Sequence, residues 1–421
     1  MNPAGEEPKL TCLGKLVIAA LIMGCFVGAG YYFLMGKTAP GSTSNASNRT
    51  DPGGGSFSTP STPQNGSANP TPPSTPGTRV EFGLAYGSEK KRWLEAAVID
   101  FAKTPEGQNI KVNLISMGSL QAAQAIVGGD KRIQAWSPAS NLYKDVFITE
   151  WQVKYPNPPI IKEETVALTP MVYVFWDERY KAFEAKYHAI NFATIGQALQ
   201  EKTGWDGIAQ KADWGFFKFG HTHPNKSNSG LMTLVLMAHE FHKKDRGLEM
   251  KDILNPVFQD WMQGVERGVA GLSDSSGDMM KEMVLKGPSA YDGMFTYESV
   301  VIDYLKNAQG RWGDLKVVYP EKNMWNDHPY YILDAEWSTP DQRKAAQVFL
   351  EYLMSEPLQK RSLEHGFRPG NPAVPIKFEE SPFVLYQKNG LKVDLNTTCQ
   401  PPKADVINNL LGSWQRAQGN R

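Results

Sequence analysis

The segment 220–230, Gly-His-Thr-His-Pro-Asn-Lys-Ser-Asn-Ser-Gly, has the composition of a loop that holds a polar or anionic ligand. The aromatic segment 214–219 predicts a strand before it, and the apolar run 231–237 predicts a helix after it. A helix that begins on Ser or Asn directs backbone N–H groups and its positive end toward one point. Ser227 and Ser229 are the hydroxyls expected there. The pattern also fits an ordinary capped helix, so this segment alone does not establish a ligand site.

Three further serines follow predicted strands near the start of the folded body. The alternation of strands and helices over about 79–136 predicts a parallel sheet. Ligands bind beyond the carboxyl ends of such strands. Serine is common in turns, so one such residue means little. A serine after each of three strands favours a pocket, and the candidates are Ser88, Ser119, and Ser137 or Ser140.

Two strand-like segments predict connections between two lobes. The first, 165–176, contains Thr169-Pro170, where the proline removes a ladder donor and predicts a bend or an edge. The second, 287–298, contains Tyr297. The segment between them would form a second lobe that carries the 220–230 loop. The expected boundaries are 79–170 and 297–400 for lobe 1, 171–296 for lobe 2, and 401–421 for a C-terminal tail.

The N-terminal part predicts attachment to a membrane. Residues 16–35 are apolar and uncharged, and twenty residues suffice to span a bilayer as a helix. We expect a cytoplasmic tail over 1–15, a transmembrane anchor over 16–36, and a disordered tether over 37–78, which is rich in Pro, Ser, Thr and Gly. An alternative is lipidation of Cys25, because Ile-Met-Gly-Cys resembles a bacterial lipoprotein cleavage site. Both interpretations place the folded body outside the cytoplasm.

The order of motifs from about 80 to 400 resembles the bacterial extracellular solute-binding proteins of the two-lobed periplasmic type II, nearest the molybdate- and sulfate-binding branch. No single motif is specific, but their order and spacing together are. The matching pieces are Gly87-Ser88, Met117-Gly118-Ser119, 135–140, Thr169-Pro170-Met171-Val172, 224–230, Tyr297-Glu298, 326–329, 343–350, Gln359 and 366–369.

The resemblance implies an α/β fold of two lobes, joined by two crossover strands, that close on a ligand by a hinge. Hydroxyls and backbone N–H groups can hold a dehydrated oxyanion without a counter-charge, because several donors share the negative charge. The anchor and tether depart from freely diffusing family members, so local delivery by a tethered receptor is expected. The ligand contacts that the resemblance implies are Ser88, Ser119, Ser137, Ser140, Thr169, Ser227, Ser229 and Tyr297.

Composition and motifs argue against other classes. The 44 basic and 44 acidic residues cancel, which argues against a nucleic-acid partner. Cys399 is the one cysteine beyond the N-terminal segment, so neither an internal disulfide nor a Cys-based metal site is expected. The histidines over 239–242 miss the metalloprotease spacing. The loop 274–278 lacks the closing Glu of a calcium loop, and it is expected to cap a helix.

Nothing in the chain indicates an enzyme or a cofactor. Ser229 does not lie in a Gly-x-Ser-x-Gly elbow, and no phosphate-binding Gly-x-x-x-x-Gly-Lys loop is present. We therefore expect a membrane-anchored extracytoplasmic receptor for a small polar or anionic solute, in ABC-type uptake or sensing, with a membrane permease as partner. The alternative is a non-transport interaction module of a membrane-associated complex, to which exposed Trp312, Trp325 and Trp337 would contribute.

Overall fold

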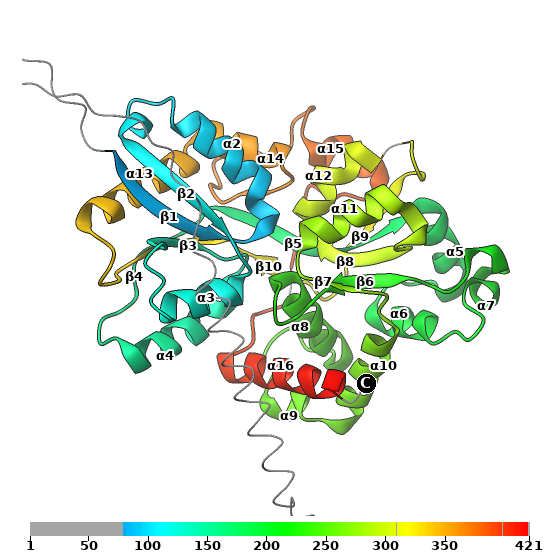
Figure 1. Ribbon diagram of the computed structural model, residues 1–421. Helices are drawn as coiled ribbons and strands as arrows, with labels where there is room; N and C mark the ends of the chain where they lie inside the picture. The colour runs from blue at the N-terminus through cyan, green and yellow to red at the C-terminus, as the bar shows by residue number, and fades with distance from the viewer. Residues whose placement is uncertain (1–78, 309, 398, 420–421) are drawn as a thin grey trace, which may run out of the picture. The chain divides into compact units, whose positions relative to one another are not determined.

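A computed structural model describes residues 79–308, 310–397 and 399–419. The expected tail, anchor and tether over 1–78 lie outside these residues. Within the described ranges, none of the helices combines the length and the apolar character needed to cross a bilayer. The described chain forms two β-sheets, each covered by helices on both faces (Figure 1).

The first sheet consists of β1 (Val80–Tyr86), β2 (Ile110–Ser116), β3 (Ala135–Ser137), β4 (Ile160–Thr165) and β11 (Pro329–Leu333). Its strand order is β2-β1-β3-β11-β4. The first three strands are parallel, as predicted, and β11 runs antiparallel to its two neighbours. Tyr86 lies opposite Ser116 on one side and Ser137 on the other, so these three strands end at one edge.

Helices cover both faces of this sheet and complete what we call the first lobe (Figure 1). Alternate residues of β1, such as Phe82 and Leu84, pack with Trp93 and Phe349 on one face. Trp136 packs against Phe147 on the opposite face, with ring centroids 5.0 Å apart. The helices of the first face are α2 (Lys91–Phe101), α13 (Pro340–Met354) and α14 (Glu356–Glu364), and those of the second are α3 (Ser119–Val127) and α4 (Lys144–Lys154).

Strand β5 (Ala167–Trp176) changes partners along its ten residues. It pairs first with β12 (Arg368–Pro369), then with β10 (Trp325–Asn326), and finally with β8 (Gly293–Tyr297) and β9 (Leu315–Val318). The Thr169-Pro170 step, where a bend or an edge is expected, does not interrupt the strand. Pro170 instead lies opposite Trp325, beside the point where the partner strands change, and a missing donor is tolerated there.

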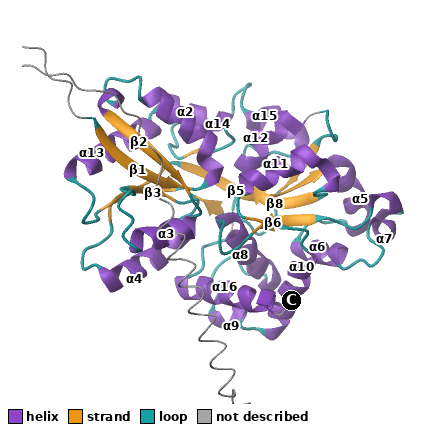
Figure 2. Cartoon of the chain, viewed as in Figure 1, coloured by secondary structure: helices purple, strands orange, loops and turns teal. Residues whose placement is uncertain are grey.

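The second sheet continues from β5 in the order β10-β5-β8-β6-β7, with β9 also paired to β5. Strand β6 (Phe219–Thr222) is parallel to both β7 (Leu272–Ser273) and β8. The sheet and its helices form the second lobe (Figure 2). These helices are α5 (Asp177–Tyr187), α6 (Phe192–Leu199), α7 (Trp205–Ala209), α8 (Asn228–His242), α9 (Met250–Ile253), α10 (Pro256–Gly268), α11 (Ser276–Lys286), α12 (Glu298–Ala308) and α16 (Ala404–Gly419).

The structure differs from the sequence expectations at three further places. The strand expected over 214–219 is β6, which begins at Phe219, because Trp214 ends a 3₁₀ turn and Gly215 has a φ of 70°. The chain returns to the first lobe through β10 rather than through 287–298, so α12 and β9 belong to the second lobe. The segment expected to be a C-terminal tail forms α16, which packs on α8, α9 and α10.

Candidate functional site

A cavity of about 180 Å³ lies where loops of the two lobes meet. Loops 87–89 and 116–119 come from the first lobe, and residues of 226–228 and 274–278 come from the second. Since a water molecule occupies about 30 Å³ in the liquid, the cavity has room for about six waters or one small solute. Three of the predicted contact residues line it, namely Ser88, Ser119 and Ser227.

The first-lobe loops are placed by the register of the parallel strands. Because Tyr86 lies between Ser116 and Ser137, the chain leaves all three strands at the same edge. Ser119 begins α3, and its Oγ accepts a hydrogen bond from Ala139 N at 3.1 Å. The N-terminal end of α3, where backbone N–H groups have no partner within the helix, therefore borders the cavity.

The second-lobe loops are placed by β6 and β7, in which Thr222 lies opposite Ser273. Asn228 begins α8 and lines the cavity with the N-terminal end of that helix. Ser275 is the N-cap of α11, since its side chain accepts a hydrogen bond from Asp278 N at 3.2 Å. The cavity is thus bordered by helix N-termini from both lobes.

Two contacts hold the lobes against each other at the cavity. Ser88 Oγ and Ser275 Oγ are 3.1 Å apart. A Cβ placed on Gly118 would lie 2.1 Å from the carbonyl oxygen of Lys226, so at this position only glycine permits the observed approach. Loops far apart in the sequence therefore enclose the cavity by direct contact between the lobes.

Ser137 and Ser140 lie in the first lobe behind the cavity wall. Ser140 Oγ accepts a hydrogen bond from Leu142 N at 3.3 Å and caps a short 3₁₀ turn. Ser137 Oγ is buried and has no hydrogen-bond partner among the described residues. These two serines do not line the cavity in this conformation, and their role as ligand contacts stays a prediction.

Thr169 and Ser229 are also buried behind the wall. Thr169 Oγ1 accepts a hydrogen bond from Ser299 N at 3.0 Å and fixes α12 to β5. Ser229 Oγ lies 2.6 Å from Thr222 Oγ1 and 3.1 Å from Ser227 Oγ. Ser229 therefore positions the loop between β6 and α8, whereas Ser227 is the member of this group that reaches the cavity.

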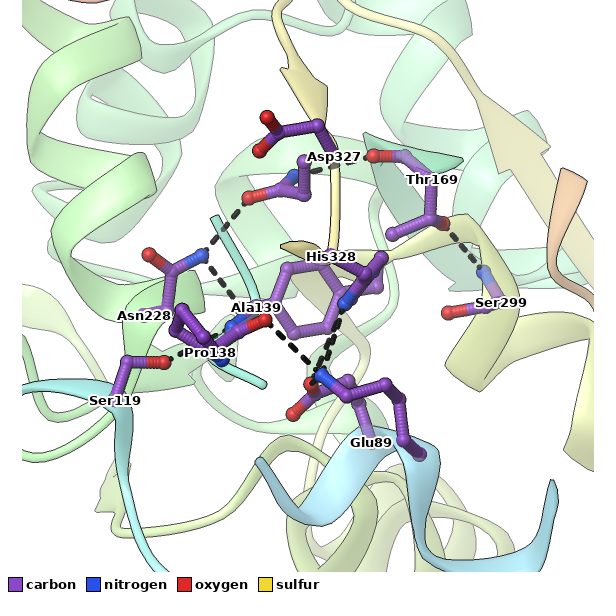
Figure 3. A network of polar contacts seen from close by, with 12 residues as sticks. Glu89, Ser119, Pro138, Ala139, Thr169, Asn228, Ser299, Asp327 and His328 are labelled. Carbon is purple, nitrogen blue, oxygen red and sulfur yellow. Dashed lines mark hydrogen bonds and ion pairs between the residues drawn. The ribbon is translucent and has the colours of Figure 1, made fainter. Parts of the chain in front are cut away.

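A chain of side-chain amides connects the cavity to the crossover strands (Figure 3). Asn326 Nδ2 donates to the Thr169 carbonyl at 3.2 Å, and because a carbonyl only accepts, this fixes the orientation of the Asn326 amide. Asn326 Oδ1 then accepts from Asn228 Nδ2 at 2.8 Å, and Tyr297 Oη accepts from the same nitrogen at 2.9 Å. Asn228 Oδ1 is buried and is left without a partner among the described residues.

A buried charge cluster forms part of the first-lobe wall (Figure 3). Lys90 Nζ is fully buried and lies 2.6 Å from Glu89 Oε1, 3.2 Å from the Pro138 carbonyl and 3.2 Å from His328 Nδ1. Burial opposes ionisation of Glu89, but the Lys90 charge prevails and lowers its pKa to about 2. Burial and the Lys90 charge lower the pKa of His328 to about 4. Near pH 7 Glu89 is therefore ionised and His328 is neutral.

Further charges stand at the mouth of the cavity. Lys226 Nζ lies 2.9 Å from Asp274 Oδ2, and both side chains are more than half exposed. Asp278 is exposed and lines both the cavity and a neighbouring groove of about 550 Å³. Ser88 and Glu89 also line both spaces. The groove therefore adjoins the cavity along residues of both lobes.

Contacts with the C-terminal helix α16 hold the loop between β6 and α8 in place. His221 Nε2 lies 2.9 Å from Glu266 Oε1, and Trp414 Nε1 donates to Glu266 Oε2 at 2.6 Å. Burial alone would lower the pKa of His221, but the Glu266 carboxylate raises it overall. The His223 ring lies 4.9 Å from the Trp414 ring. These histidines thus serve packing, and no group of three or more potential metal ligands occurs among the described residues.

Sequence reasoning missed several residues of the cavity wall. Glu89 directly follows Ser88, but its burial depends on Lys90 and on the distant His328, which no local pattern reveals. Asn228 lies in the segment 220–230 between Ser227 and Ser229, and only these two serines are expected from the sequence to contact a ligand. The loop 274–278 was interpreted as a helix cap, and it both caps α11 and lines the cavity.

Known structures share this fold at low sequence identity. A periplasmic thiamin-binding protein matches 81% of this chain and 97% of its own length, with a TM-score of 0.55 and 11% identity. The binding protein AfuA from Actinobacillus pleuropneumoniae, with bound fructose-6-phosphate, matches 80% and 98%, with a TM-score of 0.53 and 13% identity. The sulfate-binding protein SubI from Mycobacterium tuberculosis matches 82% and 99%, with a TM-score of 0.51 and 14% identity.

The sequence itself gives a family assignment. Comparison with curated proteins finds no match. The family model described as bacterial extracellular solute-binding protein matches residues 82–368, well over half of the chain and most of both lobes. The chain therefore belongs to the bacterial extracellular solute-binding protein family.

Proposed function

We propose that this protein is a membrane-tethered receptor that closes its two lobes on one small polar solute and passes it to an ABC-type permease. The observation that carries the proposal is the cavity of about 180 Å³, which is lined by loops of both lobes and lies at the carboxyl ends of the parallel strands. Members of the family bind solutes and are not enzymes.

The contacts between the lobes support closure as the binding step. Ser88 and Ser275 meet across the cavity, and Arg92 of α2 forms an ion pair with Asp303 of α12, Nη1 to Oδ2, at 3.1 Å. A ligand that touches loops of both lobes stabilises the closed state by its greater affinity for that state. Ser88, Ser119 and Ser227 are proposed as direct contacts, with Ser137, Ser140, Thr169, Ser229 and Tyr297 as the layer behind them.

The tether decides how the solute would be delivered. The apolar segment 16–36 would anchor the chain, and the segment 37–78 would let the body reach a neighbouring permease while staying at the membrane. Delivery would then depend on the local concentration of receptor rather than on diffusion through the compartment.

A ligand screen tests the receptor function. The full chain in detergent is heated with sulfate, molybdate, phosphate, amino acids, sugars and thiamin, one at a time. A ligand at 100 times its dissociation constant adds about 2.7 kcal/mol to the stability of the folded state. One class of solute should raise the melting temperature. If no member of the panel does so, the interaction module becomes the better proposal, and Trp312, which is 45% exposed, is its first candidate contact.

A glycine substitution tests closure separately. Gly118→Ala places a Cβ against the Lys226 carbonyl, so it should block the closed state and weaken binding of the solute found in the screen by at least about tenfold. Gly412→Ala is the matched control, because its Cβ would have room on α16, away from the cavity. Equal affinity for Gly118→Ala and the unmodified chain would show that ligand binding does not need this contact between the lobes.

A further inference from the structure

The cavity walls carry more acceptors than an oxyanion site would. Glu89, Asp274 and Asp278 line the cavity, and Lys226 is its one lining residue with a positive charge. Lys226 is already paired with Asp274. A small anion that entered this space would therefore face carboxylates without a compensating positive charge. This electrostatic repulsion opposes binding of sulfate or molybdate.

Lys90 cannot supply the missing donor. An ammonium group has three N–H donors. The three contacts of Lys90 Nζ, with Glu89, Pro138 and His328, account for all of them. The side chain is also fully buried and does not line the cavity. Its charge serves to keep Glu89 ionised, not to attract a ligand.

Two residues that line the cavity, Glu89 and Asn228, carry side-chain acceptor oxygens. Lys90 and His328 both contact Oε1 of Glu89, which leaves Oε2 as the oxygen for the cavity that Glu89 lines. Asn228 Oδ1 is buried and lacks a partner among the described residues, and its orientation is fixed by Asn326. A buried acceptor without a donor is costly, so Asn228 Oδ1 favours a ligand that donates a hydrogen bond, and the Glu89 carboxylate at the cavity favours a cation.

The donors of the site come from helix ends. The first turns of α3 and α8 contain no acidic residue, and both helices begin at the cavity, with Ser119 and Asn228. The positive ends of two helices suit an anionic group. In contrast, α11 carries Asp278 in its own first turn. The cavity thus combines a donor side at α3 and α8 with an acceptor side at Glu89, Asn228 Oδ1 and Asp278.

We propose that the solute is a small zwitterion of the amino-acid class, with its protonated amine against Glu89 and the Asn228 side-chain carbonyl and its carboxylate at the start of α3 and α8. This inference rests on the proposed receptor function and names its substrate class. Among the described residues, no group of three or more His, Cys, Asp or Glu that could hold a metal ion is found. An organic ammonium, with three donors and no acceptor, matches the wall.

The test uses the full chain in detergent and isothermal titration with matched probes. Glycine, L-serine and L-glutamine carry both groups, ethanolamine carries the amine alone, acetate carries the carboxylate alone, and sulfate and molybdate are bare oxyanions. At least one amino acid should bind, at least about tenfold more tightly than either single-group probe. Binding of sulfate, molybdate or an uncharged sugar in preference to amino acids would overturn the inference and leave the receptor function intact. Failure of every solute class would count against the receptor function itself.

Two variants locate the amine. The double variant Glu89→Gln with Lys90→Met removes both buried charges together, which avoids an unpaired charge in the folded state. It should weaken amino-acid binding at least about tenfold. Asp278→Asn lies at the exposed mouth, so the fold should be unaffected, and binding should weaken about two- to threefold, less at high salt. Glu282→Gln, on the same helix but outside the cavity lining, is the control. Unchanged amino-acid affinity in the double variant would overturn the assignment of the amine.

Discussion

Two buried ion pairs, Glu89–Lys90 and Glu298–Arg368, differ in how completely their polar atoms are used. Arg368 donates from Nε and Nη2 to the two oxygens of Glu298, each at 2.8 Å. Two more of its five N–H donors reach the carbonyl groups of Val393 and Lys392, each at 2.7 Å. Glu89 accepts a hydrogen bond from Lys90 on Oε1, and it also lines a cavity. We call Glu298–Arg368 the closed pair, because both oxygens of its carboxylate accept from the guanidinium, and Glu89–Lys90 the open pair, because Glu89 lines the cavity.

The comparison distinguishes a buried ion pair that stabilises the fold from one whose carboxylate lies at a cavity and can meet a ligand. Glu298–Arg368 joins α12 to β12, and Tyr319 Oη adds a further hydrogen bond to Glu298. Arg368 also lies over the Phe383 ring, at 4.7 Å from its centroid. Burial therefore does not by itself indicate a binding residue, and an unsatisfied oxygen at a cavity is the more informative feature.

The largest expected effect comes from opening the closed pair. Glu298→Ala leaves the Arg368 guanidinium buried without a counter-charge, so the free energy of unfolding should fall by about 3–5 kcal/mol. Urea denaturation followed by tryptophan fluorescence measures this loss. The double variant Glu298→Leu with Arg368→Met should recover most of it. A double variant no more stable than the single one would contradict the view that the unpaired charge is the cause.

Removal of Lys90, the cation of the open pair, should lower the free energy of unfolding by less than Glu298→Ala does. Lys90→Met leaves Glu89 without its counter-charge, but water in the cavity can solvate that carboxylate, so a loss of about 1–3 kcal/mol is expected. If the solute carries an amine, saturating amino acid should restore more stability to Lys90→Met than it adds to the unmodified chain. The control is Arg368→Met, whose loss the same ligand should not preferentially restore. If saturating amino acid stabilised the unmodified chain, Lys90→Met and Arg368→Met equally, the two ion pairs would not differ in their relation to the ligand.

A further expected effect is spread over a range of pH. Burial and the neighbouring Lys90 lower the pKa of His328 to about 4, below the value of about 6.5 expected in the unfolded chain. As the pH falls from about 6.5 to 4, the unfolded chain takes up a proton that the folded chain refuses. The contribution of His328 to stability is therefore complete above pH 6.5, and it declines by at most about 1.4 kcal/mol per pH unit within this window.

The variant His328→Asn isolates that contribution. Asparagine tolerates the positive φ of 33° found at this position and does not titrate. Between pH 6.5 and 4, its stability should depend less steeply on pH than that of the unmodified chain. The raised pKa of His221 acts in the opposite direction, because its contribution is present below pH 6.5 and is lost as pH rises through the folded pKa. Parallel pH profiles for His328→Asn and the unmodified chain would mean that His328 is not protected from protonation.

Sequence reasoning found the parts of the site that follow from local rules. Parallel strands end at one edge, and Ser88 and Ser119 line the cavity there, while their role as ligand contacts stays a prediction. The starts of α13 and α14 also follow from local sequence, because a capping box at Thr339 and prolines in both first turns fix them. These features depend on residues a few positions apart.

The features that sequence reasoning missed depend on contacts between residues that are far apart in the sequence. Lys90 and His328 are 238 positions apart, and their approach requires β11 to pair with β3. The burial of Lys90 contradicts the usual exposure of lysine, so no composition rule predicts it. Similarly, β6 contains His221 and Thr222, which look like loop residues until Glu266 and Ser229 supply their partners. Global packing overrode the local preference in each case.

The C-terminal helix has a practical consequence for anyone who edits this gene. Residues 404–419 form α16, whose Trp414 shares Glu266 with His221, directly below the loop that opens α8. Deletion of residues 404–419 would therefore remove a supporting wall of the second lobe. An affinity tag or fluorescent reporter fused after this helix needs a spacer, so that the final turn of the helix can still dock.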